Sequence, residues 1–480
     1  MIQMTRLNTS SPRTLAATFF VTLLPLYFLS YQYRTRHPYG GSTFDKPTSP
    51  SASTFSSSSQ LSASESFIQT WLSTHLIDPY NPAPLAAYCN STSITWHPNL
   101  VFNLHDANGG IGNVRGNVLD FLFTAIEMGA SIILPGMASR QEDNLSNVWG
   151  GRQELSAMFD EAWLVNMLGK TCPEMKIYKI EEGMEMVPAV EGVWTSRTRR
   201  VDEGFGNTAK EGWEALKGWL SGNEDFKRRY GGVEMLSRAV EGEVVVVNLG
   251  RTLWDMDTRS LPRGLRRNFG QLVKVGAMYK GLAALVVWRL VERFGLDLDP
   301  SEAVPRGQFY GAHLRTADDA KNAGWMDVEG MNASAQMEEY IGHAKEHKLR
   351  VIYVASGNIE DVERLKQKAA TEVPQIAVVS KTDLLPAHEA SALSELSWDQ
   401  QALVDWEVLK RCSVFGGIVK SSFAYNIAMT RNQYLEDRSI VNEPWAVLHS
   451  EHNMAFDDGL SRIFGRDEWH ERRIPRGMWP

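Results

Sequence analysis

The chain has 480 residues, of which 43% are hydrophobic and 22% charged, and its formal net charge is -8. This length supports a large core and two domains, and the mildly acidic balance argues against a general nucleic-acid-binding surface. The three cysteines include no CxxC pair, which disfavours a zinc ribbon or a thioredoxin-like site and allows one disulfide with one thiol left over.

The first predicted element is a membrane anchor, preceded by a short tail at residues 1–13. Residues 14–33 read TLAATFFVTLLPLYFLSYQY and carry no charge. A helix of this length spans about 30 Å, the thickness of a bilayer core. A cleaved signal peptide has a shorter apolar core and small residues at its cleavage site, so we favour an uncleaved signal anchor. The flanking arginines are balanced and leave the orientation open.

Residues 34–84 follow as a Ser-rich stem, which we predict to be disordered because it offers few apolar groups to bury. An anchor, a stem and then a folded body are typical of an enzyme held at a membrane and facing a lumen. Glycosylation sequons that begin at Asn90, Asn144 and Asn332 agree with a lumenal side.

The body alternates strands with helices. Strands are predicted at 99–104, 131–135, 243–249, 309–315, 351–356, 375–380 and 414–419, with helices at 117–129, 281–295, 360–370 and 398–412 and after the turn in 420–431. This alternation predicts an α/β fold with mostly parallel sheets covered on both faces. A break near Pro300 and Pro305 divides it into two Rossmann-like domains facing a cleft, 85–300 and 301–480 with a C-terminal extension.

A glycine loop, NGGIGNVRGN, follows the first strand of the body and opens a helix. Backbone amides in such a place can cradle a phosphate, and glycines there can also simply ease helix–strand packing. Gly110, Gly112 and Gly116 give GxGxxxG rather than GxGxxG, and the next strand ends without the carboxylate that holds a ribose. The spacing therefore disfavours a nicotinamide-dependent oxidoreductase.

The segment FYGAHLRTADDA ends a predicted strand on two basic side chains. His313 and Arg315 are alternate residues, so both point to the same face. The carboxyl ends of strands in open α/β sheets form the ligand crevice. The structural alternative is an exposed basic strand end or an arginine paired with a nearby carboxylate. Asp318 and Asp319 follow on a loop and are expected to be solvated.

Four segments resemble, in order, the motifs of the O-fucosyltransferase superfamily. They are ANGGIGNVRGNVLDFLFTAIEMGASIILPGM, MFDEAWLVNMLGKTCPEM, GAHLRTADDA and QALVDWEVLKRCSVFGGIVKSSFAYNIAMTR. Each motif alone is weak, but four in family order are specific and extend over about residues 99–431. The resemblance implies a GT-B fold with an acceptor side in 85–300, a nucleotide-sugar side in 301–480, GDP-fucose as donor and no metal cofactor.

The resemblance also implies roles for individual residues. Arg315 would stabilise the charge that develops on the donor β-phosphate, and His313 would help to position the donor. Asp405 would accept hydrogen bonds from a guanine edge or a ribose. A packed histidine and a solvated helix carboxylate are the structural alternatives for the last two.

Two further motifs contribute to the donor site in this reading. Ser421, Ser422 and Phe423 open a helix and would contact the diphosphate and the nucleotide, although a plain Ser N-cap is the structural alternative. Gly110 and Gly112 belong to the donor-binding loop.

An inverting transfer needs a base for the acceptor hydroxyl. Asn113 falls where some protein fucosyltransferases have an Asn and others an acid; an amide cannot act as a base but can orient the donor. Asp106 is the nearest carboxylate on this loop and is the candidate base. Two departures from the family pattern are Ala424, where several relatives carry a further Ser, and Ala317, where many plant-type members have an acid.

Short acid-x-acid pairs offer a competing, metal-dependent reading. WDMD contains Asp255 and Asp257, and LDLD contains Asp297 and Asp299. A metal would neutralise the same diphosphate charge for which the His-Arg strand end and the Ser-Ser-Phe turn are suited. We therefore expect no metal.

The sequence as a whole predicts a single-pass membrane glycosyltransferase in the Golgi or endoplasmic reticulum lumen. It would transfer fucose from GDP-fucose to a protein Ser/Thr or glycan hydroxyl with inversion, and nucleic acid is not an expected partner. The alternative is a catalytically inactive relative that binds glycans or sugar nucleotides. Because Cys89 and Cys172 lie in one half and Cys412 in the other, we expect a Cys89–Cys172 disulfide and a free Cys412.

Overall fold

The computed structural model describes residues 61–74, 80–104, 107–141, 143–179, 187–195, 209–237, 243–254, 256–436, 454–467, 473–474 and 476–480. They belong to one compact unit, Leu61–Pro480. The predicted tail (1–13), the predicted anchor (14–33) and residues 34–60 and 75–79 of the predicted stem lie outside the described residues. None of the helices within the described ranges is both long enough and apolar enough to cross a bilayer.

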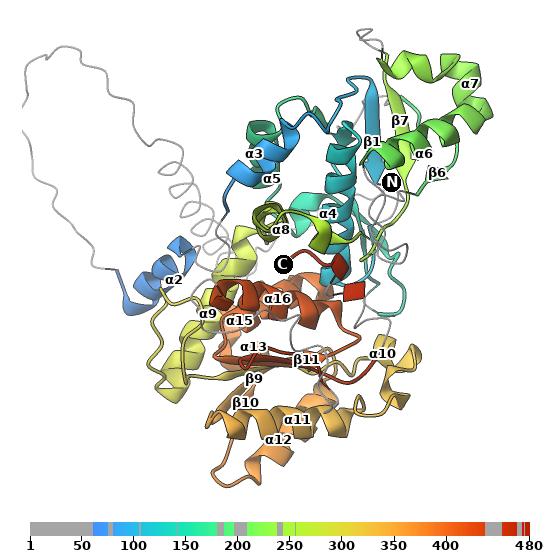
Figure 1. Cartoon of the computed structure of the whole chain (residues 1–480). Coiled ribbons are helices and arrows are strands. Elements are labelled where there is room, and N and C mark those ends of the chain that lie inside the picture. The colour runs from blue at the N-terminus through green and yellow to red at the C-terminus, as the bar shows by residue number, and fades with distance from the viewer. Residues whose placement is uncertain are drawn as a thin grey trace, which may run out of the picture. The chain divides into compact units, whose positions relative to one another are not determined.

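The first half of the body is built on a parallel sheet with the strand order β5–β2–β1–β7–β6. Figure 1 labels β1, β7 and β6 of this sheet. The strands are β1 Leu100–Leu104, β2 Ser131–Ile133, β5 Ile177–Tyr178, β6 Val193–Trp194 and β7 Val245–Leu249. A β3–β4 hairpin (Met137–Ser139, Gly151–Gln153) follows β2. The helices of this half are α3 Ala83–Cys89, α4 Ile111–Glu127, α5 Glu161–Thr171, α6 Ala209–Gly222, α7 Glu224–Tyr230 and α8 Arg263–Phe269.

The second half is built on a six-stranded sheet with the order β10–β9–β8–β11–β13–β12, parallel except for the β12–β13 pair. Its strands are β8 Tyr310–His313, β9 Val351–Ala355, β10 Ala377–Val379, β11 Val414–Ile418, β12 Met454–Asp457 and β13 Ser461–Phe464. Its helices are α10 Asp318–Asn322, α11 Ala333–Glu346, α12 Ile359–Ala370, α13 Lys381–Leu384, α14 Ala387–Ser394, α15 Trp398–Lys410 and α16 Ser422–Glu436. The predicted α/β architecture with two mostly parallel sheets is confirmed.

Local sequence signals explain where several helices begin and end. Ser397 forms a capping box with Gln400 at the start of α15, and Gly295 ends α9 (Ala277–Phe294) in the left-handed conformation. Helix α4 begins at Ile111, six residues before the predicted start, because Gly110 is its N-cap. The glycine loop is therefore shorter than expected, and its second part is already helical.

Helix α2 (Ala63–Ser73) corrects the prediction of a disordered stem that extends to residue 84. Its N-cap Ser62 forms a capping box with Glu65, and Phe67 and Trp71 are buried in the core. The Arg411 guanidinium lies 4.0 Å from the Trp71 ring, and its Nη2 donates to the Thr74 carbonyl at 2.8 Å. Two aromatic residues at i and i+4 supply the apolar surface that Ser-rich sequence lacks.

The two halves are interleaved along the chain. Helix α9 precedes residue 300 but packs against α2 and α15 (Figure 1). In the opposite direction, Trp479 packs in the first half, where its Nε1 donates to Asp120 Oδ1 at 2.8 Å and its ring lies 4.6 Å from that of Phe269.

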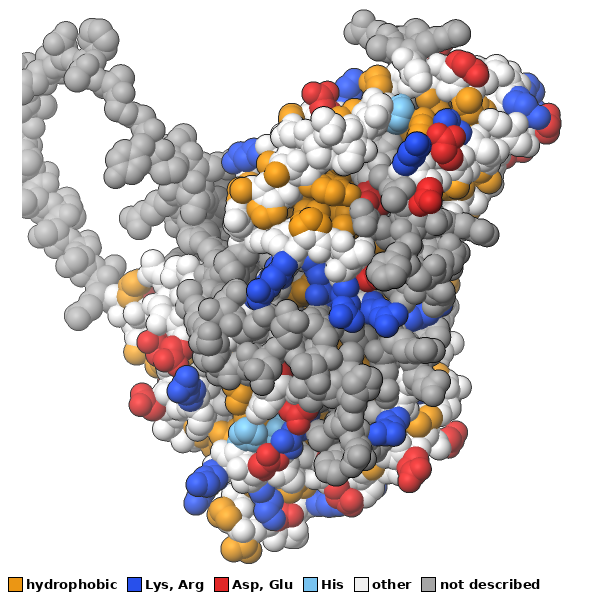
Figure 2. Space-filling view, viewed as in Figure 1, with side chains coloured by type: hydrophobic (Ala, Val, Ile, Leu, Met, Phe, Trp, Pro, Cys, Tyr) orange, Lys and Arg blue, Asp and Glu red, His pale blue; other side chains and the backbone are white. Residues whose placement is uncertain are grey.

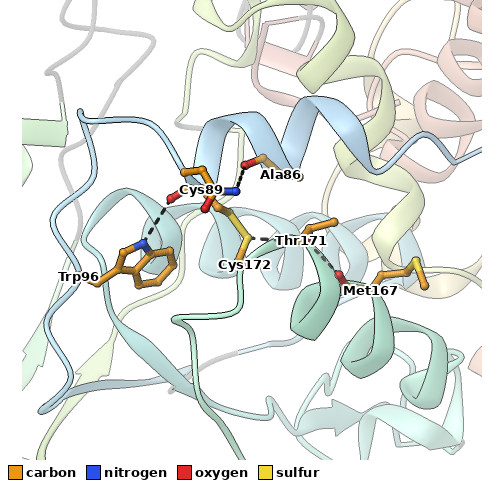
Figure 3. The surroundings of a disulfide bond; sticks show 7 residues. Ala86, Cys89, Trp96, Met167, Thr171 and Cys172 are labelled. Atoms are coloured by element: carbon orange, nitrogen blue, oxygen red, sulfur yellow. Dashed lines mark hydrogen bonds between the residues drawn. A yellow bond between two sulfur atoms is a disulfide. The ribbon is translucent and has the colours of Figure 1, made fainter.

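The predicted disulfide is confirmed. Cys89, the last residue of α3, is bonded to Cys172, which directly follows α5, and their Cα atoms are 5.3 Å apart (Figure 3). The Cys89 carbonyl also accepts a bond from Trp96 Nε1 at 3.3 Å. Cys412 is buried and free, as expected.

Charged side chains are unevenly distributed over the surface. Lys and Arg gather in a band across the middle of the face shown in Figure 2, although the chain as a whole has a net charge of -8. The net charge of the chain therefore does not predict the local charge of this face.

Candidate active site

A cavity of 870 Å³ lies where the carboxyl ends of both sheets meet. Its walls come from the segments that follow β1, β3 and β7 in the first half and β8, β9, β10 and β11 in the second. Such a crevice is where open α/β sheets bind ligands. Most of the predicted site residues line it: Gly110, Asn113, His313, Arg315, Asp405, Ser421, Ser422 and Phe423.

Arg315 is held in a fixed orientation at the end of β8. Its Nη1 donates to Asp319 Oδ1 at 2.7 Å, and its Nη2 donates to Asp319 Oδ2 at 2.5 Å. The guanidinium also lies 5.4 Å from the centre of the Trp325 ring. Two parallel bonds to one carboxylate fix the plane of the guanidinium as well as its position.

Asp319 is largely buried and paired, whereas the sequence predicts a solvated side chain. Its side chain is 11% exposed, whereas that of Asp318 is 81% exposed. Helix α10 begins at Asp318 and carries Asp319 back towards Arg315, four residues earlier. Burial would raise the pKa of the Asp319 carboxyl, but the guanidinium groups of Arg315 and Arg140 outweigh it and hold that pKa below its ordinary value.

His313 is a neutral imidazole. Burial, together with the positive charge of Arg315, lowers its pKa to about 3. Its Nδ1 lies 3.2 Å from Ser421 Oγ, and its ring is 4.5 Å from that of Phe423. His313 is therefore packed and hydrogen-bonded, and it also lines the cavity. A packed histidine and a residue that contacts a ligand are thus not alternatives at this position.

Two helix N-termini meet beside the cavity. Ser422 Oγ, at the start of α16, donates to Asn113 Oδ1 in the first turn of α4 at 2.6 Å. Ser421 Oγ accepts a bond from the Ala424 amide, as an N-cap does. The positive ends of two helix dipoles at one place favour an anionic ligand.

Gly112 does not line the cavity, which corrects its expected place in a donor-binding loop. A Cβ atom there would lie 2.8 Å from Ser422 Oγ, so the missing side chain allows α4 and α16 to approach each other. Ala424 is fully buried against Gly417 of β11 and does not line the cavity. A serine hydroxyl at that position would face the sheet.

Asp405 lines the cavity but is already hydrogen-bonded. Tyr353 donates to its Oδ1 at 2.6 Å, and Lys381 donates to its Oδ2 at 2.5 Å. The structural alternative of a solvated helix carboxylate does not hold, because Asp405 is buried, 4% exposed, with a lysine beside it in the same wall. The pair offers both an acceptor and a donor to a ligand.

Several lining residues were not predicted. They are Arg140, Arg251, Trp254, Trp325, Lys381 and Trp398. Arg140, Arg251 and Lys381 each follow a strand within two residues, and that position is the one signal that could have found them.

The structure places none of the other carboxylates, proposed as a base or as metal ligands, at the cavity within the described residues. Asp106 and Asp255 lie outside the described residues. Asp257 accepts a bond from the Arg259 amide at 3.1 Å and Asp299 one from the Ser301 amide at 2.7 Å, and neither lines the cavity. Over the described part of the chain, acidic, histidine and cysteine side chains form no group of three that could hold a metal ion.

Comparisons with known proteins give one match by family and several by structure. The model of the family GDP-fucose protein O-fucosyltransferase matches residues 100–434. POFUT1 in complex with GDP-fucose is similar at 12% identity over 70% of this chain and 96% of that one, with a TM-score of 0.40. A variant of Arabidopsis thaliana FUT1 in complex with GDP is similar at 13% identity (77% of each chain, TM-score 0.34), and Bradyrhizobium NodZ at 10% (68% and 89%, TM-score 0.33). No curated protein matches the chain.

Proposed function

Because the chain belongs to the GDP-fucose protein O-fucosyltransferase family, we propose that it transfers fucose from GDP-fucose to a hydroxyl group and inverts the anomeric carbon. The two sheet-based halves would form a GT-B pair, with the donor in the cavity between them. The observation that carries this proposal is Arg315, fixed by Asp319 at the end of β8 and lining that cavity.

In the proposed reaction, the acceptor oxygen bonds to the anomeric carbon of fucose while the bond from that carbon to the β-phosphate oxygen breaks. Negative charge then grows on the β-phosphate. The Arg315 guanidinium and the N-terminus of α16 provide fixed positive charge for it, with no reorganisation at the moment of reaction. The neutral His313 positions the donor and does not act as an acid, since its pKa of about 3 leaves the ring uncharged near neutral pH.

The other site residues take supporting roles in this proposal. Asn113 orients the donor from α4, and Ser421 and Ser422 bind the diphosphate from the start of α16. Asp405, with Lys381 beside it, contacts the base or the ribose. Asp106 is the proposed base that receives the acceptor proton, and the acceptor is a protein Ser/Thr or a glycan hydroxyl.

We further propose that the reaction needs no divalent metal and takes place in the lumen of the Golgi or endoplasmic reticulum, with residues 14–33 as the anchor. The proposal of metal independence rests on Arg315 and the N-terminus of α16, which already supply positive charge to neutralise the diphosphate. The proposal of a lumenal location rests on the apolar segment, the sequons and the Cys89–Cys172 disulfide.

The test is donor hydrolysis and transfer by the full-length chain, offered a panel of sugar nucleotides with and without excess EDTA. We expect GDP-fucose to be hydrolysed slowly in the absence of an acceptor and at the same rate with EDTA. Binding of GDP-fucose without any turnover would favour the inactive relative. A reaction stopped by EDTA and restored by manganese would contradict metal independence.

A further inference from the structure

Two arginines from opposite halves of the molecule converge on one carboxylate. Arg315 and Asp319 belong to the second half, whereas Arg140 directly follows β3 in the first half. Arg140 Nη1 donates to Asp319 Oδ2 at 2.7 Å, the same oxygen that accepts from Arg315 Nη2 at 2.5 Å. Asp319 thus joins the proposed catalytic arginine to Arg140, which precedes Asp319 by 179 positions in the chain.

Arg140 is itself held on several sides. Its side chain is 6% exposed, and the same Nη1 donates to the Leu145 carbonyl at 2.6 Å. Its guanidinium lies 5.0 Å from the centre of the Trp398 ring, and its Nε is 3.7 Å from Asp399 Oδ1. Contacts with both halves give Arg140 one orientation, which is what a support for another side chain requires.

We infer that Arg140 is a positioning residue that fixes Arg315 through Asp319, so that the catalytic guanidinium is correctly placed only when the two halves are packed together. This inference rests on the proposed function of Arg315. Arg140 need not touch the donor. Its effect is to keep Asp319 ionised and in the plane that accepts two bonds from Arg315.

The charges around Asp319 show why one arginine is not equivalent to two. Burial raises the pKa of this carboxyl, and Arg315 and Arg140 lower it. The other groups that face Asp319 are the neutral His313 and the buried Asp399. Burial raises the pKa of the Asp399 carboxyl; the charge of Arg140 opposes this rise, and the charge of Asp319 adds to it. Without Arg140, burial and Asp399 would act against Arg315 alone, and Asp319 would bind a proton at a higher pH.

The experiment compares Arg140→Met, Arg140→Lys and the wild-type full-length chain in steady-state kinetics with GDP-fucose. We expect Arg140→Met to lower kcat by about 10- to 100-fold, because a small displacement of a catalytic group has effects of this size. KM for the donor should change less than kcat. Arg140→Lys keeps the charge and should recover part of kcat.

The pH profile separates this role from a merely structural one. In Arg140→Met the acid limb of the kcat profile should move to higher pH, since Asp319 is protonated more easily, and in Arg140→Lys it should stay closer to wild type. The matched control is Arg289→Met, which removes an arginine paired with Glu389 outside the cavity. Its kcat per folded molecule and its acid limb should equal those of the wild type.

Each outcome decides the inference. An Arg140→Met protein that is folded, by its circular dichroism, and has wild-type kcat and acid limb overturns it. If the wild type itself turns over no GDP-fucose, the proposed function fails. The positioning role of Arg140 is then still tested by comparing crystal structures of the wild type and Arg140→Met. A guanidinium of Arg315 displaced from Asp319 in Arg140→Met supports the inference, and two unchanged bonds overturn it.

Discussion

Arg315 is oriented in the absence of any ligand, because both terminal nitrogens of its side chain donate to Asp319. A lysine in its place would keep the charge but could not make two coplanar bonds. We therefore expect Arg315→Lys and Arg315→Ala both to lose transition-state stabilisation, by about 2–4 kcal/mol in kcat/KM for GDP-fucose. Folding is checked by thermal unfolding. A folded Arg315→Ala protein with a near-normal rate would contradict its assigned role.

Buried neutral histidines should make the protein acid-sensitive. Burial, with Arg462 and His347 nearby, lowers the pKa of His343 to about 2. The unfolded chain takes up a proton near pH 6.5 and the folded chain does not, so stability falls as the pH drops below about 6.5, by up to about 1.4 kcal/mol per pH unit for this group. In urea unfolding between about pH 7 and pH 5, His343→Gln should show a smaller loss than wild type.

The control for this measurement is His388→Gln, since the His388 side chain is 71% exposed. Its stability should depend on pH as the wild type's does. Equal pH dependence in wild type and His343→Gln would show that His343 does not contribute to acid sensitivity.

At the scale of elements, the contact between the starts of α4 and α16 depends on one missing side chain. A Cβ at Gly112 would lie 2.8 Å from the Ser422 carbonyl carbon and 2.9 Å from the Phe423 nitrogen. We expect Gly112→Ala to destabilise the protein by about 1–3 kcal/mol through overpacking and to lower activity, because the start of α16 must shift. Thermal unfolding and donor hydrolysis measure the two effects.

Gly169 is the matched control, because it lies in helix α5 and a Cβ there would have no neighbour within 4 Å. Gly169→Ala should leave activity unchanged and raise stability by about 0.5–1 kcal/mol, the difference in helix propensity. If Gly112→Ala behaved like Gly169→Ala, the close approach of the two helices would not matter.

Helix α2 is a structural part of the body and not a segment of the stem. Trp71 is 3% exposed and lies beneath Arg411. We expect Trp71→Ala to lower the free energy of unfolding by about 3–5 kcal/mol, as large-to-small changes in cores do. Leu61→Ala, at a position that is 52% exposed, is the control and should have little effect. If the midpoint of chemical unfolding were unchanged in Trp71→Ala, α2 would not contribute to the stability of the body and would count as part of the stem.

Some elements and site residues could be predicted from the sequence because their signals are local. The strand that carries His313, the turn before α16 and the glycine loop each follow from a short run of residues, and all three border the cavity. The pairing of Arg140 with Asp319 could not be predicted, since the two residues are 179 positions apart, although the place of Arg140 directly after a strand is a local signal for a lining residue. Helix α2 was missed because serine-rich composition outweighed two aromatic residues four positions apart.

At the scale of the whole molecule, the halves are held together by segments that cross between them. Helix α9 packs on α15, and Trp479 returns to the first half beside Asp120. Arg140 and the Asn113–Ser422 bond join the halves at the cavity itself. Packing of the halves and geometry of the cavity are therefore one property of the unit Leu61–Pro480, which no local reading of the sequence could supply.

The last prediction concerns the compartment that this unit faces. Asn90, Asn144 and Asn332 each begin a sequon, and all three are exposed. Asn144 and Asn332 use their side-chain oxygens to accept bonds from the Ser146 and Ala335 amides. A glycan is attached through the side-chain nitrogen, so these contacts are compatible with modification. If residues 14–33 anchor the chain with its body in the lumen, the expressed protein should carry N-glycans.

Glycosidase treatment should then increase the gel mobility of the wild type and leave a triple Asn→Gln variant unchanged. Asn223→Gln, at an asparagine outside any sequon that caps α7, controls for the substitution itself. Protease added to intact microsomes should digest the body only after detergent opens the vesicles. Because the Cys89–Cys172 bond also needs an oxidising compartment, alkylation under non-reducing, denaturing conditions should label Cys412 alone. An unglycosylated body that protease removes from sealed microsomes, with three reactive thiols, would place it on the cytosolic side.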